Sequence, residues 1–192
     1  MNVLIIYAHP YEGSFNKAIL TNTIEGLNHA GHQYELIDLN GEGFDPVLTR
    51  EELAKYPEGE YLDPKVGEYL DKIKAADHLV FIFPIWWGGV PAILKGFFDK
   101  VLLKKQTYDF KGKWPQGKLK GKSATVISTM NSPKIFYNLI GKAPIKHTMI
   151  NGSLKLCGIK PVKWIEFSEV LSISQIKREG MLDRILDYFT NL

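Results

Sequence analysis

The segment from Phe83 to Asp99 carries residue types suited to binding a flat aromatic ligand. It contains Trp86 and Trp87, followed directly by Gly88 and a second glycine. Tryptophan offers a large apolar face and an N–H that needs a partner, and glycine lets a ligand approach the backbone closely. These residues favour a site for one face of a planar heteroaromatic ring, with backbone N–H groups aimed at its polar edge. A purely structural aromatic corner is the alternative that the residues alone leave open.

Polar residues between His9 and Asn16 form a second candidate group. The backbone N–H groups at the start of a helix, the Ser14 hydroxyl and the Asn16 amide together make a neutral cradle for an anion such as a phosphate. His9 adds a hydrogen-bond donor, or a positive charge when protonated. The alternative is simply a capped helix that follows a core strand.

Other nucleotide and catalytic motifs are absent from the sequence or incomplete. There is no G-x-G-x-x-G motif, so a Rossmann dinucleotide site is not expected. Residues Gly112–Lys118 fit G-x-x-x-x-G-K, but Leu119 stands where a Ser or Thr must bind magnesium, and no strand precedes the motif. We find no cluster of metal ligands at suitable spacing and no G-x-S-x-G nucleophile motif. The sequence therefore predicts no metal site.

The composition is that of an ordinary globular chain. The 192 residues are 45% hydrophobic and 23% charged, with a net charge of only +3, which is too small to indicate a nucleic-acid partner. Seven lysines fall between Lys104 and Lys122, opposed there only by Asp109. This stretch favours a solvated loop over an anion-binding patch.

Several features predict a cytoplasmic protein without membrane insertion. Cys157 is the only cysteine, so the chain forms no internal disulfide, as is usual in a reducing compartment. The N-terminus has no basic region before its apolar run, unlike a signal peptide. The longest uncharged run, residues 79–94, is interrupted by proline and glycine and is too short to span a bilayer.

The elements that position the candidate residues alternate between strands and helices. The apolar runs predict five strands, at residues 3–7, 34–39, 79–83, 124–128 and 162–167. Helical spacing predicts helices that begin after Ser14 and after Ser174, and others at residues 66–76, 90–103 and 132–156. Residues 104–122 are expected to form a long connection.

The alternation indicates an α/β fold: one doubly wound domain, residues 1–192, whose five-stranded parallel sheet has helices on both faces. In such sheets ligands bind beyond the carboxyl ends of the strands. Those ends are expected at His9-Pro10, at Pro84–Trp87 and at Thr129–Asn131.

The chain resembles the flavodoxin-like NAD(P)H:quinone oxidoreductase family, which includes DT-diaphorase and its bacterial relatives. The matching motifs are His9-Pro10 with Ser14-Phe15-Asn16, residues 83–97, and Phe44-Asp45-Pro46-Val47-Leu48. The resemblance covers nearly the whole chain. It implies a flavodoxin-like sheet of order 2-1-3-4-5, FAD (or alternatively FMN) as cofactor, and a homodimer with active sites at the subunit interface.

Carried over residue by residue, the resemblance implies three groups of flavin-binding residues. The phosphate region would be held by His9, Ser14, Phe15 and Asn16. Pro84, Ile85, Trp86 and Trp87 would lie along the ring, with the Trp86 and Trp87 backbones bonding to it. Gly88 stands at a position that is aromatic in DT-diaphorase, and Thr129 and Asn131 fall where family members meet the pyrimidine edge.

Tyr137 matches the active-site tyrosine of the family and is the predicted catalytic residue. The histidine that pairs with it in DT-diaphorase falls on Ala143, a departure from the family pattern. His147 is the candidate replacement. Without a proton relay, the rate is expected to fall by a factor of about 10²–10⁴ if the relay acts as a general acid.

The resemblance implies a ping-pong reductase. NAD(P)H would pass a hydride to the flavin and leave, and a quinone-type acceptor would then take the same slot and receive two electrons. The missing histidine keeps an alternative open: a flavin-binding ancillary subunit of a potassium efflux system, with little turnover of its own. An electron-carrying flavodoxin is disfavoured, because such carriers are usually strongly acidic and this chain has a net charge of +3.

Overall fold

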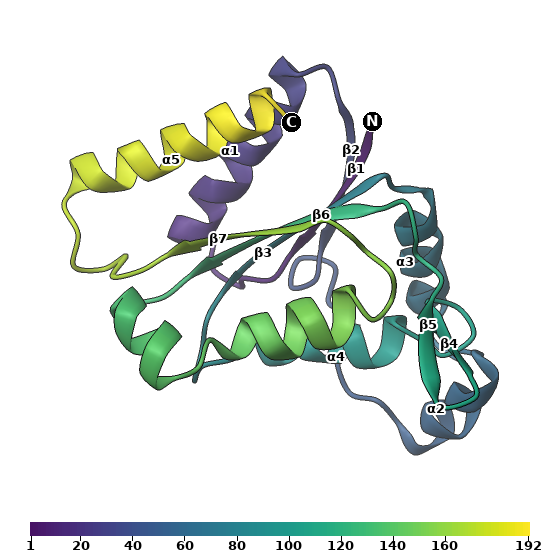
Figure 1. Ribbon diagram of the computed structural model, residues 1–192. Coiled ribbons are helices and arrows are strands. Elements are labelled where there is room, and N and C mark those ends of the chain that lie inside the picture. The colour runs from purple at the N-terminus through teal and green to yellow at the C-terminus, as the bar shows by residue number, and fades with distance from the viewer.

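The apolar runs of the sequence form the strands of a parallel sheet (Figure 1). The computed structural model describes residues 1–192. All neighbouring strands of this sheet run parallel, in the order β2-β1-β3-β6-β7. The strands are β1 (Asn2–Tyr7), β2 (Gln33–Asp38), β3 (His78–Pro84), β6 (Ser123–Thr129) and β7 (Val162–Phe167). The central strand β3 is buried along its whole length, as expected for a strand covered on both faces.

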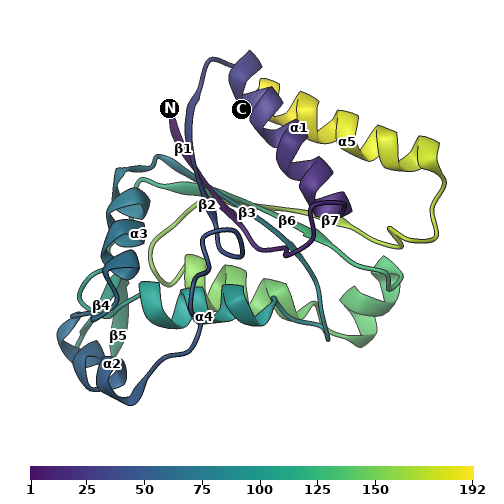
Figure 2. The ribbon, with the colours of Figure 1, turned by 180° about the vertical axis from the view of Figure 1, so that it is seen from behind.

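Helices cover both faces of the sheet (Figures 1 and 2). Helices α1 (Phe15–His29) and α5 (Gln175–Thr190) lie on one face, where they pack against each other. On the other face lie α3 (Pro64–Ala75), α4 (Ala92–Val101) and the π-helical segment η3 (Lys146–Leu154). Because successive side chains of a strand point to opposite faces, Ile5 of β1 enters one core and Leu4 and Ile6 enter the other.

The predicted strand order is confirmed for the main sheet. Two further strands, β4 (Tyr108–Lys111) and β5 (Trp114–Gly117), pair only with each other as an antiparallel hairpin. When they are left out of the count, the order is 2-1-3-4-5. The long connection predicted over residues 104–122 contains this hairpin, which the sequence did not predict; Gly112, with φ of 63°, allows the chain to turn back on itself.

The helical stretch expected over residues 132–156 is also different in the structure. It consists of two short π-helical segments, η2 (Phe136–Ile140) and η3. The break falls at Lys142 and Ala143, both with positive φ, just before Pro144. Proline disfavours helical geometry in the residue before it, and this explains why one continuous helix does not form.

A helix that the sequence reading did not include lies between β2 and α3. It consists of α2 (Arg50–Lys55) and the 3₁₀ turn η1 (Tyr56–Glu58). Thr49 and Glu52 form a reciprocal capping box at its start, a pattern that is visible in the sequence. No helix in the chain is both long enough and apolar enough to cross a bilayer.

Candidate functional site

The carboxyl ends of β1, β3 and β6 meet at one edge of the sheet and bring three of the predicted site residues together. The amide nitrogen of the buried Asn16 donates to Thr129 Oγ1 at 2.8 Å. The carbonyl of Thr129 accepts from the backbone N–H of Ile85 at 2.7 Å. Helix α1, the loop after β3 and the end of β6 are therefore joined directly, at the point where the strand order reverses.

The start of α1 provides the helix N-terminus of the predicted cradle, whereas the Asn16 side-chain amide donates to Thr129 instead. Ser14 is the N-cap, and its hydroxyl accepts from the backbone N–H of Lys17 at 3.1 Å. No hydrogen bond within the chain takes up the N–H groups of Phe15 and Asn16. These are first-turn donors at the positive end of the helix dipole, the arrangement that binds phosphates and other anions.

His9 lies half-buried beside this cradle as a neutral donor. Its Nδ1 accepts from the backbone N–H of Tyr11 at 3.1 Å, so the ring proton lies on Nε2 in the neutral form. Burial lowers the pKa of His9 from its ordinary value, which favours the neutral ring over a positive charge. The ring lies 5.9 Å from that of Trp86, between centroids, so the histidine links the cradle to the aromatic segment.

Residues Trp86–Gly89 form a tight turn with free donors at its tip. The backbones of Trp86 and Gly89 exchange two hydrogen bonds of 3.1 and 3.0 Å. Trp87 and Gly88 between them have φ of 50° and 78°, the signs found in a type I′ turn. Neither the Trp87 nor the Gly88 N–H has a partner within the chain, and the Trp87 indole is fully exposed. Of the two predicted backbone donors, Trp86 is occupied and Trp87 is available.

Tyr137 lies against the same turn, with its hydroxyl bonded on both sides. The hydroxyl donates to the carbonyl of Gly88 at 3.0 Å and accepts from the backbone N–H of Ile145 at 3.3 Å. Burial raises the pKa of this tyrosine above its ordinary value. Ala143, where the resemblance places the family histidine, is buried with positive φ. His147 is exposed, and no hydrogen bond joins it to Tyr137.

The remaining predicted residues contribute packing or loop contacts at this edge. Pro84 is buried as the last residue of β3, and Phe15 packs edge-on against Phe167. The side-chain oxygen of Asn131 accepts from the backbone N–H of Leu171 at 3.3 Å, so it holds the loop that follows β7.

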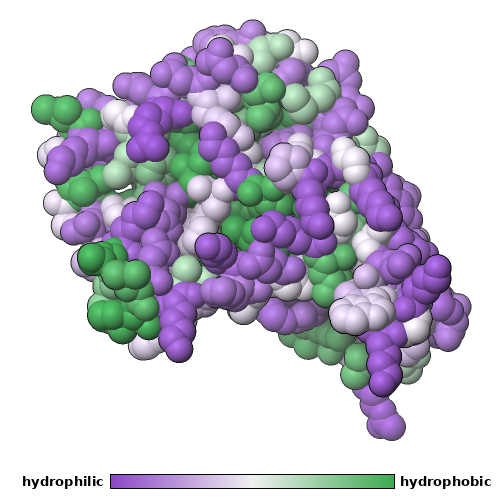
Figure 3. Space-filling view, viewed as in Figure 1, coloured by the Kyte–Doolittle hydropathy of each residue, from purple (hydrophilic) through white to green (hydrophobic).

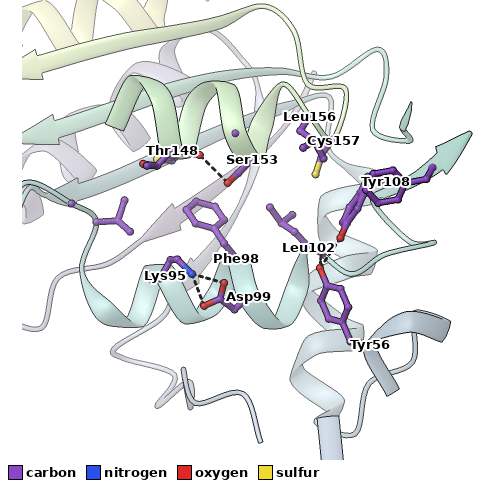
Figure 4. A pocket seen from close by; sticks show the side chains of 15 residues that line it. Tyr56, Lys95, Phe98, Asp99, Leu102, Tyr108, Thr148, Ser153, Leu156 and Cys157 are labelled. Atoms are coloured by element: carbon purple, nitrogen blue, oxygen red, sulfur yellow. Dashed lines mark hydrogen bonds and ion pairs between the residues drawn. The ribbon is translucent and has the colours of Figure 1, made fainter. Parts of the chain in front are cut away.

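A cleft of about 530 Å³ opens between α4 and η3, next to the Trp86–Gly89 turn (Figure 4). Phe98 of α4 and Leu102 just after it face Met149 and Leu156 across the cleft, and Gly89 and Val90 form one end. Lys95 and Asp99 form an ion pair of 2.5 Å at its rim. The cleft is mainly apolar. It includes Gly89 and Val90 from the loop after β3 but no residue of the cradle at the start of α1.

Two tyrosines that the sequence reading missed form the far end of this cleft. The hydroxyls of Tyr56 and Tyr108 lie 3.0 Å apart, and burial together with this contact raises the pKa of Tyr56 well above its ordinary value. The capping box at Thr49 pointed to a helix just before Tyr56, but nothing in the sequence indicated that Tyr56 and Tyr108 would meet.

The residues at this edge fit a flavin. Asn16 Oδ1 is buried without a partner, so one acceptor in the cradle is left for a ligand. Four backbone N–H groups, those of Phe15, Asn16, Trp87 and Gly88, are also unpaired within the chain. A Cβ at Gly88 would meet no atom within 4 Å, so the tip of the turn is open space. The arrangement offers donors for a phosphate at one end and for a flat ring with a polar edge at the other.

Comparison with known proteins points to the same family. The family model described as flavodoxin-like fold matches residues 1–189. A protein of Haemophilus influenzae named an uncharacterised NAD(P)H oxidoreductase is 34% identical over 186 residues, covering 95% of this chain and 91% of that protein. The mouse ribosyldihydronicotinamide dehydrogenase (quinone) is 31% identical, with 82% of this chain and 77% of the mouse protein covered.

Solved structures agree in fold over the whole chain. An NAD(P)H:quinone oxidoreductase from Methanothermobacter marburgensis superposes with a TM-score of 0.89 at 31% identity, over 100% of this chain and 98% of that one. Smu.1420 from Streptococcus mutans UA159 also gives a TM-score of 0.89, at 36% identity over the full length of both chains. The fold, the motifs and these relatives together show that the chain belongs to the flavodoxin-like NAD(P)H:quinone oxidoreductase family.

Proposed function

We propose that this protein is a flavin-dependent NAD(P)H:quinone oxidoreductase that works by ping-pong transfer of two electrons. The observation that supports it most is that two segments with unpaired backbone N–H groups, the start of α1 and the Trp86–Gly89 turn, are brought to the same edge of the sheet. The Asn16–Thr129 hydrogen bond and the bond from Ile85 to Thr129 join them there. The names of the relatives support NAD(P)H as reductant and a quinone as acceptor. Two-electron transfer from hydride to acceptor is the chemistry that a bound flavin supplies.

The residues of this chain would bind and orient the cofactor. The first-turn N–H groups of Phe15 and Asn16, with the Ser14 hydroxyl and His9 Nε2, would hold the phosphate region. The N–H groups of Trp87 and Gly88 would meet the polar edge of the ring. Pro84, Ile85, Thr129 and Asn131 would shape this part of the site. FAD or FMN suits such a set of contacts, and FAD is the form that we expect.

Tyr137 would act on the flavin through the Trp86–Gly89 turn. Its hydroxyl holds the carbonyl of Gly88, and therefore fixes the turn whose N–H groups would face the ring. Protonation of the acceptor by Tyr137 itself would require this bond to open first. His147 is exposed on η3 and stays a candidate proton source only if a bound partner brings it closer.

We also propose that the protein is a homodimer that works in the cytoplasm. The apolar cleft between α4 and η3 supports a second copy as its cover, because it is lined by Phe98, Leu102, Met149 and Leu156 beside the flavin-binding turn. Two such faces can pack around a twofold axis and exclude water from both sites. The buried free thiol of Cys157 is in keeping with a reducing compartment.

The proposal is tested by the cofactor and its reduction. The purified protein is titrated with FMN and with FAD, any copurified ligand is identified by mass spectrometry, and the loaded protein is mixed anaerobically with NADPH or NADH. We expect a yellow protein whose flavin absorbance bleaches with the nucleotide and returns with a simple quinone. A correctly folded protein that binds neither flavin would overturn the assignment, and flavin binding without quinone turnover would favour the ancillary-subunit hypothesis.

A further inference from the structure

The charges of this chain are distributed very unevenly. Between Asp109 and Glu166 the sequence has no acidic residue. The same stretch contains eleven lysines, at positions 111, 113, 118, 120, 122, 134, 142, 146, 155, 160 and 163. Since the net charge of the whole chain is only +3, the rest of the molecule is acidic on balance. The stretch forms the β4–β5 hairpin, β6, η2, η3 and the first residues of β7.

An exposed apolar patch lies within this basic stretch. Ile135, Phe136, Leu139 and Ile140, here called the apolar lip, are 68%, 53%, 71% and 70% exposed. Figure 3 shows hydrophobic side chains gathered at the lower left of the molecule, where η2 lies in Figure 1. Four large apolar side chains this exposed and this close together mark an interaction site more often than chance exposure does.

The exposure of the lip follows from how η2 is anchored. Tyr137 and Asn138 are the inward residues of the segment: Tyr137 is buried against the Gly88 carbonyl, and Asn138 donates to Glu166 at 2.8 Å. The four lip residues occupy the opposite side of the same turns, at helical spacing. The segment is therefore amphipathic, with a fixed inner face and an apolar outer face.

Three lysines flank the lip, and only one of them is paired with a carboxylate. Lys142 and Lys146 are exposed, and neither forms an ion pair. Lys134 pairs with Glu166 at 2.7 Å, but the Glu166 side chain is only 7% exposed, so this carboxylate is shielded from an approaching surface. An exposed apolar ridge bordered by cations is the pattern of segments that lie in the interface of anionic membranes.

We propose that the apolar lip and its flanking lysines dock this protein peripherally on an anionic membrane surface. The apolar side chains enter the boundary between headgroups and acyl chains, and Lys134, Lys142 and Lys146 contact the lipid phosphates. Charge complementarity selects this partner, because the basic stretch would repel a basic surface and gains little from a neutral one. No spanning helix is needed for this mode of binding.

The position of the lip connects this docking to the candidate active site. Tyr137, inside η2, holds the Trp86–Gly89 turn through the carbonyl of Gly88. A membrane contact at the lip is therefore connected to that turn through a single residue, Tyr137. The nature of the acceptor is the only part of the proposal that rests on the proposed function. If that function holds, the acceptor would be a quinone dissolved in the bilayer.

Vesicle flotation tests the docking without any measurement of turnover. The full chain is mixed with vesicles of phosphatidylcholine alone and with vesicles that also contain phosphatidylglycerol. We expect flotation only with the anionic vesicles and its loss in high salt, because the Debye length falls from about 8 Å at physiological ionic strength to about 3 Å at 1 M. Equal flotation with both vesicles, or none with either, would overturn the proposal.

Matched variants locate the contact. Leu139→Ser combined with Ile140→Ser is expected to lower the partition coefficient by about tenfold or more. Lys142→Gln combined with Lys146→Gln is expected to lower it by about 25-fold, at about fivefold for each lysine. The controls are Leu53→Ser on α2, whose side chain is 57% exposed at the opposite end of the molecule (Figure 1), and Lys55→Gln beside it.

Light scattering separates lipid binding from self-association. The Leu139→Ser/Ile140→Ser variant should have the same mass in solution and the same flavin affinity as the unmodified chain. A change of mass would show that the lip is an interface between copies of the chain and would overturn membrane docking. If the unmodified chain binds no flavin but still floats with the anionic vesicles, the result counts against the proposed function and leaves the docking intact.

Discussion

A tyrosine hydroxyl has one proton to donate, and Tyr137 uses it in the hydrogen bond to the carbonyl of Gly88. The oxygen also accepts from the backbone N–H of Ile145, which is buried. Such contacts stabilise a turn, and they restrain the hydroxyl from moving toward a substrate. The sequence resemblance predicts a catalytic Tyr137, whereas the hydrogen bonds favour a residue that positions the Trp86–Gly89 turn.

Replacing Tyr137 with Phe distinguishes these roles. Removal of the hydroxyl leaves the Ile145 N–H buried and unpaired, which is expected to cost about 1–3 kcal/mol in the free energy of unfolding. We expect flavin affinity to fall and kcat to drop by less than the factor of about 10²–10⁴ typical of a lost general acid. Urea unfolding, flavin titration and steady-state kinetics measure the three quantities. A kcat loss within that range at unchanged stability and affinity would restore the proton-relay role.

His78 shows how burial alters a titratable group at the opposite edge of the sheet from the candidate site. Its ring contacts Ser123 Oγ at 2.6 Å and Thr125 Oγ1 at 3.0 Å. Burial, with a smaller effect from the nearby His32, lowers the pKa of His78 to about 4. The folded chain therefore keeps this ring neutral at pH values where the unfolded chain protonates it.

This difference predicts acid sensitivity. Between the unfolded pKa of about 6.5 and the folded pKa, the unfolded chain binds one proton more, so stability is greatest above that window and falls as the pH falls through it. The full effect is about 3 kcal/mol from this residue. Urea unfolding of the unmodified chain and of His78→Gln at pH 7 and pH 4.5 measures it. An equal loss of stability in both proteins would assign the acid sensitivity to other groups.

At the scale of elements, a close contact fixes α4 against the loop that follows β2. A Cβ on Gly96 would lie 2.2 Å from the carbonyl oxygen of Pro46. Gly96 and Pro46 belong to two of the motifs that carry the family resemblance. The glycine is therefore needed for packing, and α4 in turn sets the position of both the Trp86–Gly89 turn and the cleft.

Two alanine substitutions separate packing from helix propensity. Gly96→Ala is expected to destabilise the fold by about 1–3 kcal/mol, because the backbone of Pro46 must move. Gly180→Ala, on α5 with no atom within 4 Å of the added Cβ, is expected to stabilise it by about 0.5–1 kcal/mol. Thermal unfolding of both variants gives the comparison. If Gly96→Ala is as stable as Gly180→Ala, the contact between α4 and Pro46 can adjust without loss of stability.

How far the sequence predicts an element depends on how strongly local residues determine it. The five main strands, the Ser14 and Ser174 caps and the helices that they begin are confirmed, because apolar runs and caps act over a few residues. The hairpin over residues 108–117 was missed, since its lysines and glycines look like a solvated loop. The helical spacing over residues 132–156 predicts one helix, but Pro144 disfavours helical geometry at Ala143, and the stretch divides into η2 and η3.

At the scale of the whole molecule, the site depends on contacts that only the folded chain creates. Sequence motifs identified His9, Asn16, Trp87 and Thr129 as candidates, because each lies at the end of a strand or the start of a helix. The Asn16–Thr129 hydrogen bond joins residues 113 positions apart, and the Tyr56–Tyr108 contact joins residues 52 apart. No local pattern encodes such pairs, so the residue types were predictable and their partners were not.

The last prediction concerns the cleft between α4 and η3 as the surface that a second copy covers. Ser153 lines this cleft, and an arginine there would place a charge in the apolar contact, which costs several kcal/mol unless it finds a partner. Light scattering should show that Ser153→Arg halves the mass in solution, and far-UV circular dichroism should be unchanged. Thr21→Arg, at an exposed site of α1 on the opposite face of the sheet, should leave the mass as it was.

Because the dimer is expected to close both active sites against water, the monomer should also lose quinone turnover by at least about tenfold. An unmodified chain that is monomeric and fully active would rule out the need for a second copy.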